Sequence, residues 1–154
     1  MEAFVAAHSF RDYVFLGQGP LYGIAREASL KVTEMSCSYS QPYHSLEFRH
    51  GPKAVAGPQV CLTSFLSDTG REAELEVLTE MKELGAVTIA VCNHADAAVR
   101  RASDLVVELG LDGPELTRIA PLVIPAQLLG FFTGVQKGLN PDRPKNLTRV
   151  VLLD

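Results

Sequence analysis

The sequence predicts an α/β domain with a doubly wound, mainly parallel sheet of about five strands flanked by helices. Runs that are apolar almost throughout alternate with helical segments, and the clearest runs cover residues 13–16, 60–66, 86–92 and 104–109. Strands buried on both faces show such continuous apolar runs. Right-handed crossovers then join the parallel strands, and a ligand site is expected at their carboxyl edge.

The first strand is followed by the clearest helix of the chain. Residues 13–16 end at the turn Gly17-Gln18-Gly19-Pro20, and helical periodicity then runs over 21–36. The helix has an apolar stripe at the usual spacing, formed by Leu21, Ile24, Ala28, Val32 and Met35. Residues 37–43 look extended, and 45–56 predict a short helix broken by Gly51-Pro52.

The second half continues the alternation. Helices are predicted over 72–84, where Gly85 is placed to end the helix, over 94–102 and, as one long helix, over 114–137. A tail over 140–154 is rich in proline and asparagine before a last apolar run. No internal repeat is visible, so we expect a single domain over residues 1–154.

Composition narrows the class of protein. The chain has 154 residues, of which 47% are hydrophobic and 21% charged, and its net charge is -4. These values are typical of soluble globular proteins and give no indication of nucleic-acid or membrane binding. The three cysteines form no C-x-x-C pair, which argues against a disulfide framework or a zinc site and fits a reducing cytoplasm. We therefore expect a cytoplasmic protein without a metal.

The turn at Gly17, Gln18 and Gly19 is a candidate ligand contact. Its glycines do not follow the G-x-G-x-x-G pattern, because Tyr22 occupies the third position, so a dinucleotide site is disfavoured. Main-chain N–H groups at the start of the next helix could still approach a ligand. A turn that simply requires glycine explains the same residues equally well.

Two further groups could carry chemistry. Glu27, Lys31 and Glu34 lie at i, i+4 and i+7 beside the apolar stripe, where spacing alone favours a solvated ion-pair flank. The competing hypothesis is that a partly desolvated glutamate with a raised pKa is a general base. His50 precedes Gly51-Pro52 on a rigid bend, and histidine is a common general acid or base, although lone histidines are more often structural.

The segment after the second strong strand has two interpretations. Ser67 and Thr69 precede Gly70 at the start of a helix, where hydroxyl and main-chain N–H groups can bind a phosphate. Thr69 and Glu72 also form a capping-box pattern, and Asp68 and Glu72 would repel a phosphate. The capping interpretation is therefore favoured.

Taken together, these pieces resemble the SIS (sugar isomerase) family, whose fold is a Rossmann- or flavodoxin-like sheet. The resemblance is greatest to the second SIS domain of glucosamine-6-phosphate synthase and to related glucosamine-6-phosphate deaminases. It runs nearly end to end and rests on F-L-G-Q-G-P-x-Y at 15–22, E-A-S-L-K-V-x-E at 27–34, E-F-R-H-G-P at 47–52 and N-P-D-R-P-K-N-L-T-R at 140–149.

The resemblance implies roles for particular residues. Glu34 matches the base that moves a proton between C1 and C2 of an open-chain sugar. His50 matches a histidine that assists ring opening and reaches a neighbouring subunit's active site. Arg149 replaces a lysine and keeps its charge, so it could neutralise an oxyanion but could not form a Schiff base. The residues expected to bind substrate are Gly17, Gln18, Gly19, Lys31, Ser67 and Thr69.

The implied activity is isomerisation or deamination of an amino-sugar or hexose 6-phosphate, without a metal or organic cofactor. In the family, the main phosphate loop lies in the first SIS domain, so a second SIS domain or a homodimer partner is expected to complete the site. Two alternatives stay open. The chain could be a regulatory SIS module that binds a sugar phosphate without transforming it, or an inactive half of a two-SIS enzyme.

Overall fold

The structure is a computed structural model and describes residues 1–148. The strands are β1 (Asp12–Gly17), β2 (Tyr39–His44), β3 (Val60–Phe65), β4 (Val87–Cys92) and β5 (Leu105–Glu108). The α-helices are α1 (Glu2–Ala6), α2 (Leu21–Ser36), α3 (Arg71–Glu83), α4 (Ala97–Arg101) and α5 (Ile124–Gln136). Four short 3-10 helices are η1 (Glu47–Arg49), η2 (Pro52–Val55), η3 (Glu115–Arg118) and η4 (Ala120–Val123).

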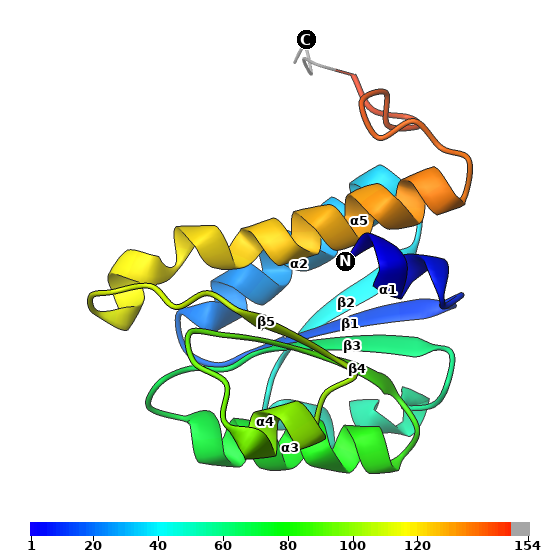
Figure 1. Cartoon of the computed structure of the whole chain (residues 1–154). Helices are drawn as coiled ribbons and strands as arrows, with labels where there is room; N and C mark the ends of the chain where they lie inside the picture. Colours follow the sequence, from blue (N-terminus) through cyan, green and yellow to red (C-terminus); the bar gives the residue numbers. More distant parts are fainter. Residues whose placement is uncertain (149–154) are drawn as a thin grey trace, which may run out of the picture.

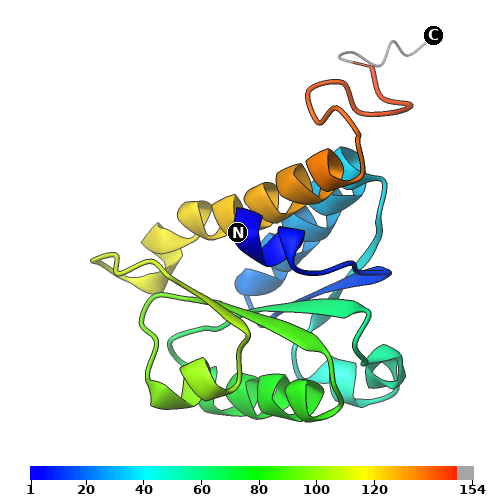
Figure 2. The same cartoon turned by 45° about the vertical axis from the view of Figure 1, so that its right-hand side comes forward.

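The five strands form one parallel sheet in the order β2-β1-β3-β4-β5. The order reverses direction between β1 and β3, as in doubly wound sheets of the flavodoxin type. Helices α1, α2 and α5 cover one face, and α3 and α4 cover the other (Figures 1 and 2). The predicted α/β fold is confirmed.

Most of the local predictions are confirmed within one or two residues. Helix α2 has the predicted bounds, and Gly51-Pro52 separates η1 from η2. The predicted long helix over 114–137 is wrong, because that segment contains η3, η4 and α5. Pro121 lacks an N–H group and would clash with the preceding turn of an α-helix, whereas Pro125 is tolerated in the first turn of α5.

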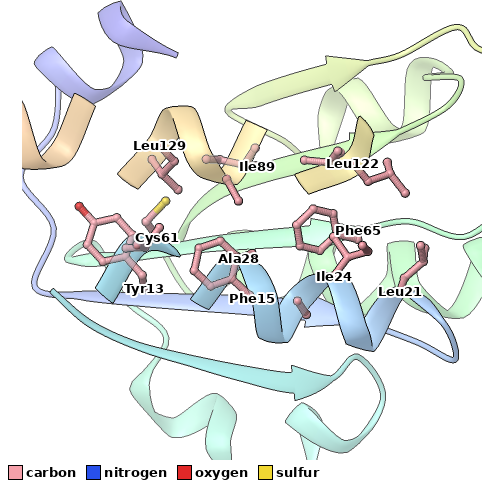
Figure 3. Packing of buried hydrophobic residues seen from close by; sticks show 14 of the residues in the cluster. Tyr13, Phe15, Leu21, Ile24, Ala28, Cys61, Phe65, Ile89, Leu122 and Leu129 are labelled. Atoms are coloured by element: carbon pink, nitrogen blue, oxygen red, sulfur yellow. The ribbon is translucent and has the colours of Figure 1, made fainter. Parts of the chain in front are cut away.

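The core consists of two apolar layers, one on each face of the sheet. Along β1, Tyr13 and Phe15 belong to the layer beneath α2 and α5, whereas Val14 and Leu16 belong to the layer above α3. Figure 3 shows the first layer, in which side chains of β1, β3 and β4 meet those of α2 and α5. Cys61 is buried in this layer as a small apolar residue, and burial raises the pKa of its thiol.

Helices α2 and α5 pack unusually closely, because two glycines of α5 face the α2 backbone. A Cβ atom on Gly134 would lie 2.3 Å from the Met35 carbonyl oxygen, and one on Gly130 would lie 3.1 Å from that of Lys31. These contacts fix the C-terminal half of α2, which carries Glu34. No helix within residues 1–148 combines the length and apolar character needed to cross a membrane.

Candidate functional site

The glycine turn lies at the carboxyl edge of the sheet, between β1 and α2. A Cβ atom on Gly17 would lie 2.3 Å from the Leu21 carbonyl oxygen, and Gly19 has a φ of +52°, so both positions require glycine for the turn itself. The Gln18 Oε1 atom is buried and accepts no hydrogen bond from any residue that the structure describes. The turn can therefore approach a ligand, but the need for glycine is explained without one.

Three of the charged residues of α2, Glu27, Lys31 and Glu34, form a row on the helix surface. The Lys31 ammonium donates a hydrogen bond of 2.7 Å to Glu34 and lies 3.6 Å from Glu27. The side chains of Lys31 and Glu34 are about one-quarter exposed. The hydrogen bond with Glu34 raises the pKa of Lys31 and keeps its charge beside that carboxylate. The row thus holds a carboxylate and an ammonium in contact at a partly desolvated position.

Glu34 does not lie at the carboxyl edge of the strands. Helix α2 starts just after β1 ends and returns along the sheet, so its last turn lies near the start of β2 (Figure 1). Thirteen residues separate Leu21 from Glu34, which is about 20 Å along a helix. The expectation of a ligand site at the carboxyl edge is therefore wrong for Glu34, since a crossover helix runs antiparallel to the strands it joins.

Glu34 instead borders an open pocket of about 550 Å³ formed with the C-terminal tail. The other residues that line it are Asp142, Arg143, Pro144, Leu147 and Thr148. The pocket is large enough for a sugar phosphate. Arg149, the third residue with an implied catalytic role, lies outside the described residues.

His50 lies on the opposite face of the sheet from Glu34. It is exposed and follows η1, while Gly51 has a φ of +131° at the bend between η1 and η2. Arg49 and Lys53 on either side of it both donate hydrogen bonds to Glu80 of α3, at 2.8 and 2.7 Å. The sheet therefore separates His50 from Glu34, and one copy of the chain does not bring the two together.

The loop after β3 is held by a buried carboxylate that sequence reasoning missed. Glu74 of α3 is 1% exposed and accepts hydrogen bonds from Ser67, at 2.7 Å from its main-chain N–H and 3.0 Å from its hydroxyl. Desolvation by burial raises the pKa of Glu74 despite these bonds. A signal was present in the sequence, because Glu74 shares the apolar stripe of Val77, Leu78 and Met81.

The predicted capping box is wrong. Helix α3 starts at Arg71 with Gly70 as its N-cap, and no side chain among residues 1–148 caps it. The Ser67 hydroxyl instead accepts a hydrogen bond of 2.9 Å from the Gly70 N–H. The loop is held instead by Glu74, two residues beyond the Glu72 of the capping pattern.

The same loop has little capacity left for a phosphate. The Asp68 main-chain N–H donates to the Glu115 carboxylate, and the Asp68 carboxylate pairs with the buried side chain of Arg118. Together with the bonds from Ser67 to Glu74, these contacts occupy the N–H groups of Ser67 and Asp68 and the Ser67 hydroxyl, which a phosphate would otherwise use. Thr69 is exposed at the tip of the loop. Within residues 1–148, no group of three or more His, Cys, Asp or Glu residues is placed to hold a metal ion.

Comparison with known sequences identifies relatives over nearly the whole chain. Residues 9–127 match the sequence profile of the SIS domain. A glutamine–fructose-6-phosphate aminotransferase (isomerizing) from Methanothermobacter thermautotrophicus is 33% identical over 147 residues, and the corresponding protein of Clostridium perfringens is 32% identical over 161. These matches cover 93% and 99% of this chain, but it spans only about a quarter of each relative, 24% and 25%.

Solved structures with the same fold are also similar in sequence. A glucosamine-6-phosphate deaminase from Thermotoga maritima aligns with a TM-score of 0.76 and 27% identity, over 99% of this chain and 44% of that one. The C-terminal domain of a glucosamine-fructose-6-phosphate aminotransferase from Francisella tularensis gives a TM-score of 0.73 and 31% identity, over 92% of this chain and 39% of that one. The chain therefore corresponds to somewhat under half of each solved chain.

Proposed function

The chain belongs to the SIS domain family, and on that premise we propose that it is a phosphosugar isomerase domain. Its substrate would be an amino-sugar or hexose 6-phosphate, and its site would be completed by a second SIS unit. The observation that carries this proposal is the pairing of Glu34 with Lys31 beside the open pocket under the tail. The relatives named glutamine–fructose-6-phosphate aminotransferase (isomerizing) support the same substrate class.

The proposed chemistry is proton transfer between adjacent carbons of the open-chain sugar. Aldose–ketose isomerisation requires a positioned carboxylate that carries the proton from one carbon to the next. It also requires a positively charged group that stabilises the enediolate. Glu34 would be the base, and Lys31 would hold it in place and contribute charge. Neither role requires a metal or an organic cofactor.

Ring opening and neutralisation of the oxyanion would depend on residues other than Glu34 and Lys31, one of them from another copy and one outside the described residues. His50 would assist ring opening in the site of another copy, since its neighbours Phe48 and Arg49 pack on the α3 side of the sheet, away from Glu34. Arg149 would neutralise the developing oxyanion, supplied by a tail that already lines the Glu34 pocket up to Thr148. We propose that residues 140–154 are a functional tail of one domain that covers 1–154.

The phosphate group would be bound mainly by the second SIS unit. The Ser67 N–H and hydroxyl are engaged with Glu74 and the Asp68 N–H with Glu115, which disfavours substrate binding by Ser67 in this copy, whereas the exposed Thr69 keeps a proposed substrate contact. We propose that Gly17, Gln18 and Gly19 contact the substrate at the carboxyl edge, where the side-chain Oε1 of Gln18 lacks a hydrogen-bond partner among residues 1–148. A cytoplasmic location fits the three free cysteines and is likewise proposed.

Isotope exchange tests the proposal directly. The full chain is incubated with fructose 6-phosphate or glucosamine 6-phosphate in deuterated water, and deuterium at C1 or C2 is measured by mass spectrometry. We expect exchange with the wild type, none above background with Glu34→Gln, and near-normal exchange with Glu27→Gln as the matched control. A ligand-dependent rise in melting temperature without exchange would identify a regulatory binding module instead.

A further inference from the structure

Residues 109–118, which we call the strap, follow β5 at the carboxyl edge of the sheet (Figure 1). Near its start the strap is bound to the loop after β4. There the Leu111 N–H donates a hydrogen bond of 2.8 Å to the Asn93 side chain, which in turn donates one of 3.0 Å to the Leu111 carbonyl oxygen. At the end of the strap, the side chains of Glu115 and Arg118 reach the loop after β3. The strap thus holds both side chains beside that loop.

Glu115 and Arg118 are the first and last residues of the short 3-10 helix η3, and both contact Asp68. Side chains at i and i+3 of a 3-10 helix lie one above the other, which explains why both reach the same residue. The Glu115 carboxylate accepts a hydrogen bond from the Asp68 main-chain N–H, and the Arg118 Nη2 atom donates one to the Asp68 carboxylate. A carboxylate of the strap therefore occupies a main-chain donor of the loop.

The guanidinium group of Arg118 uses only half of one binding edge. Arg118 is 8% exposed, and its Nε atom is buried without a hydrogen-bond partner in the part of the chain that the structure describes. Nε and Nη2 lie on the same edge of the guanidinium, and such an edge can bind two oxygens of a carboxylate or a phosphate at once. Because an unpaired buried donor is costly, the unused half of this edge indicates an acceptor that neither the strap nor the loop supplies.

We propose that the strap is an autoinhibitory latch over an oxyanion site. The site consists of the Asp68 main-chain N–H and the Arg118 guanidinium, and the Glu115 carboxylate keeps it closed. When the Glu115 side chain rotates away, the phosphate group of a ligand accepts hydrogen bonds from the Asp68 N–H and from Nε and Nη2 of Arg118. The Asp68 carboxylate gives up its bond to Arg118 in the same step and turns toward solvent, since its side chain is already 45% exposed.

The number of donors favours a phosphate group over a carboxylate as the ligand. The open site presents three donors, and a phosphate monoester offers three acceptor oxygens from one group. The two separate carboxylates of Glu115 and Asp68 leave the Arg118 Nε atom unpaired among residues 1–148, so a purely structural role for Glu115 does not account for the arrangement. A sugar phosphate and free phosphate share this chemistry.

Negative charge explains why the closed latch excludes an anion. Glu115 lies close enough to Glu74 for its charge to contribute to the raised pKa of that buried carboxyl group. A phosphate would add further negative charge to this loop unless Glu115 leaves. The inference goes beyond the proposed function, because the latch lies outside the Glu34 pocket and binding there requires no catalysis.

Isothermal titration calorimetry of the full chain with inorganic phosphate tests the latch. We expect Glu115→Ala to bind phosphate with a dissociation constant about tenfold or more below that of the wild type, because the Asp68 N–H becomes free and a negative charge is lost. The matched control is Glu72→Ala, which removes the same charge from an exposed position in the first turn of α3 and should bind like the wild type. Far-UV circular dichroism checks that each variant is folded.

A double variant that combines Glu115→Ala with Arg118→Lys tests the role of the guanidinium. Lysine keeps the positive charge but cannot bind two oxygens through one planar edge, so the gain in phosphate affinity should disappear. A wild type that binds phosphate as tightly as Glu115→Ala, an equal gain in Glu72→Ala, or a gain that survives in the double variant would each overturn the proposal.

Titration with fructose 6-phosphate identifies the source of the phosphate group. A gain on Glu115→Ala that is larger for fructose 6-phosphate than for inorganic phosphate supports the latch with a sugar phosphate as its ligand, and an equal gain supports it with free phosphate. A chain that shows no deuterium exchange would count against the proposed function and leave the latch intact.

Discussion

The Lys31 ammonium lies between two carboxylates of its own helix, 2.7 Å from Glu34 and 3.6 Å from Glu27. Lysine at the centre of such a row fixes the direction of the Glu34 carboxylate. It also supplies positive charge next to the proposed reacting carbons. The short bond to Glu34 distinguishes that residue from Glu27, which is the more exposed of the two.

Replacing Lys31 by methionine should reduce turnover while the protein stays folded. We expect kcat to fall by about 100-fold, as is typical when a group that stabilises developing negative charge in the transition state is lost. The stability should change by less than about 1 kcal/mol, because partly exposed ion pairs contribute little. Steady-state kinetics and a urea melt provide the two measurements. Lys31→Arg keeps the charge and is the control, and unchanged turnover in Lys31→Met would remove Lys31 from the site.

Mixing two inactive variants should restore activity if Glu34 and His50 act from different copies. Glu34→Gln and His50→Asn should each be strongly impaired. After equal mixing and subunit exchange, about a quarter of the sites would combine an intact Glu34 with an intact His50 from another copy, so about a quarter of wild-type activity should return. If each variant is inactive and the mixture stays inactive, His50 does not act across a subunit contact.

Replacing Gly134 by alanine should destabilise the domain. The added Cβ would lie 2.3 Å from the Met35 carbonyl oxygen, so α5 would have to move away from α2. Overpacking of this kind costs about 1–3 kcal/mol, which urea denaturation would measure. Gly23→Ala is the matched control, because no atom lies within 4 Å of its added Cβ and alanine favours a helix. Equal effects of the two variants would contradict the close packing.

Local signals explain what could be predicted of the fold. The apolar stripe that follows the turn at Gly17 fixed both ends of α2, and continuous apolar runs located β1, β3 and β4. Strand β2 was seen only as an extended segment, because it contains Pro42 and its side chains are only partly buried. The apolar content of 114–137 suggested one helix, although Pro121 and Pro125 were the better guide.

The site was harder to predict, because its geometry depends on which face of the sheet each segment covers. The position of Glu34 at the amino edge follows from the antiparallel course of a crossover helix, so connectivity alone could have given it. The position of His50 beneath the sheet depends on how η1 and η2 pass across it, and the sequence pattern does not specify that path. The bond between Glu74 and Ser67 joins residues that each lie two positions outside the capping pattern, and that pattern masked it.

The buried carboxylate of Glu74 should make stability depend on pH in an unusual direction. Burial raises the pKa of Glu74 above its ordinary value of 4.5, so the folded state holds this proton more tightly than the unfolded state. Its contribution is complete below the unfolded value and is lost as the pH rises through the raised folded value. Glu80, Asp96, Asp104 and Glu108 have lowered pKa values and act in the opposite sense, losing their contribution to stability as the pH falls.

The informative quantity is therefore the difference in unfolding free energy between the wild type and Glu74→Gln. We expect the variant to gain stability relative to the wild type as the pH rises from about 4.5 toward neutrality, because its amide has no proton to lose. Urea denaturation of both proteins across this range measures that difference. A difference that stays constant with pH would show that Glu74 titrates alike in the folded and unfolded states.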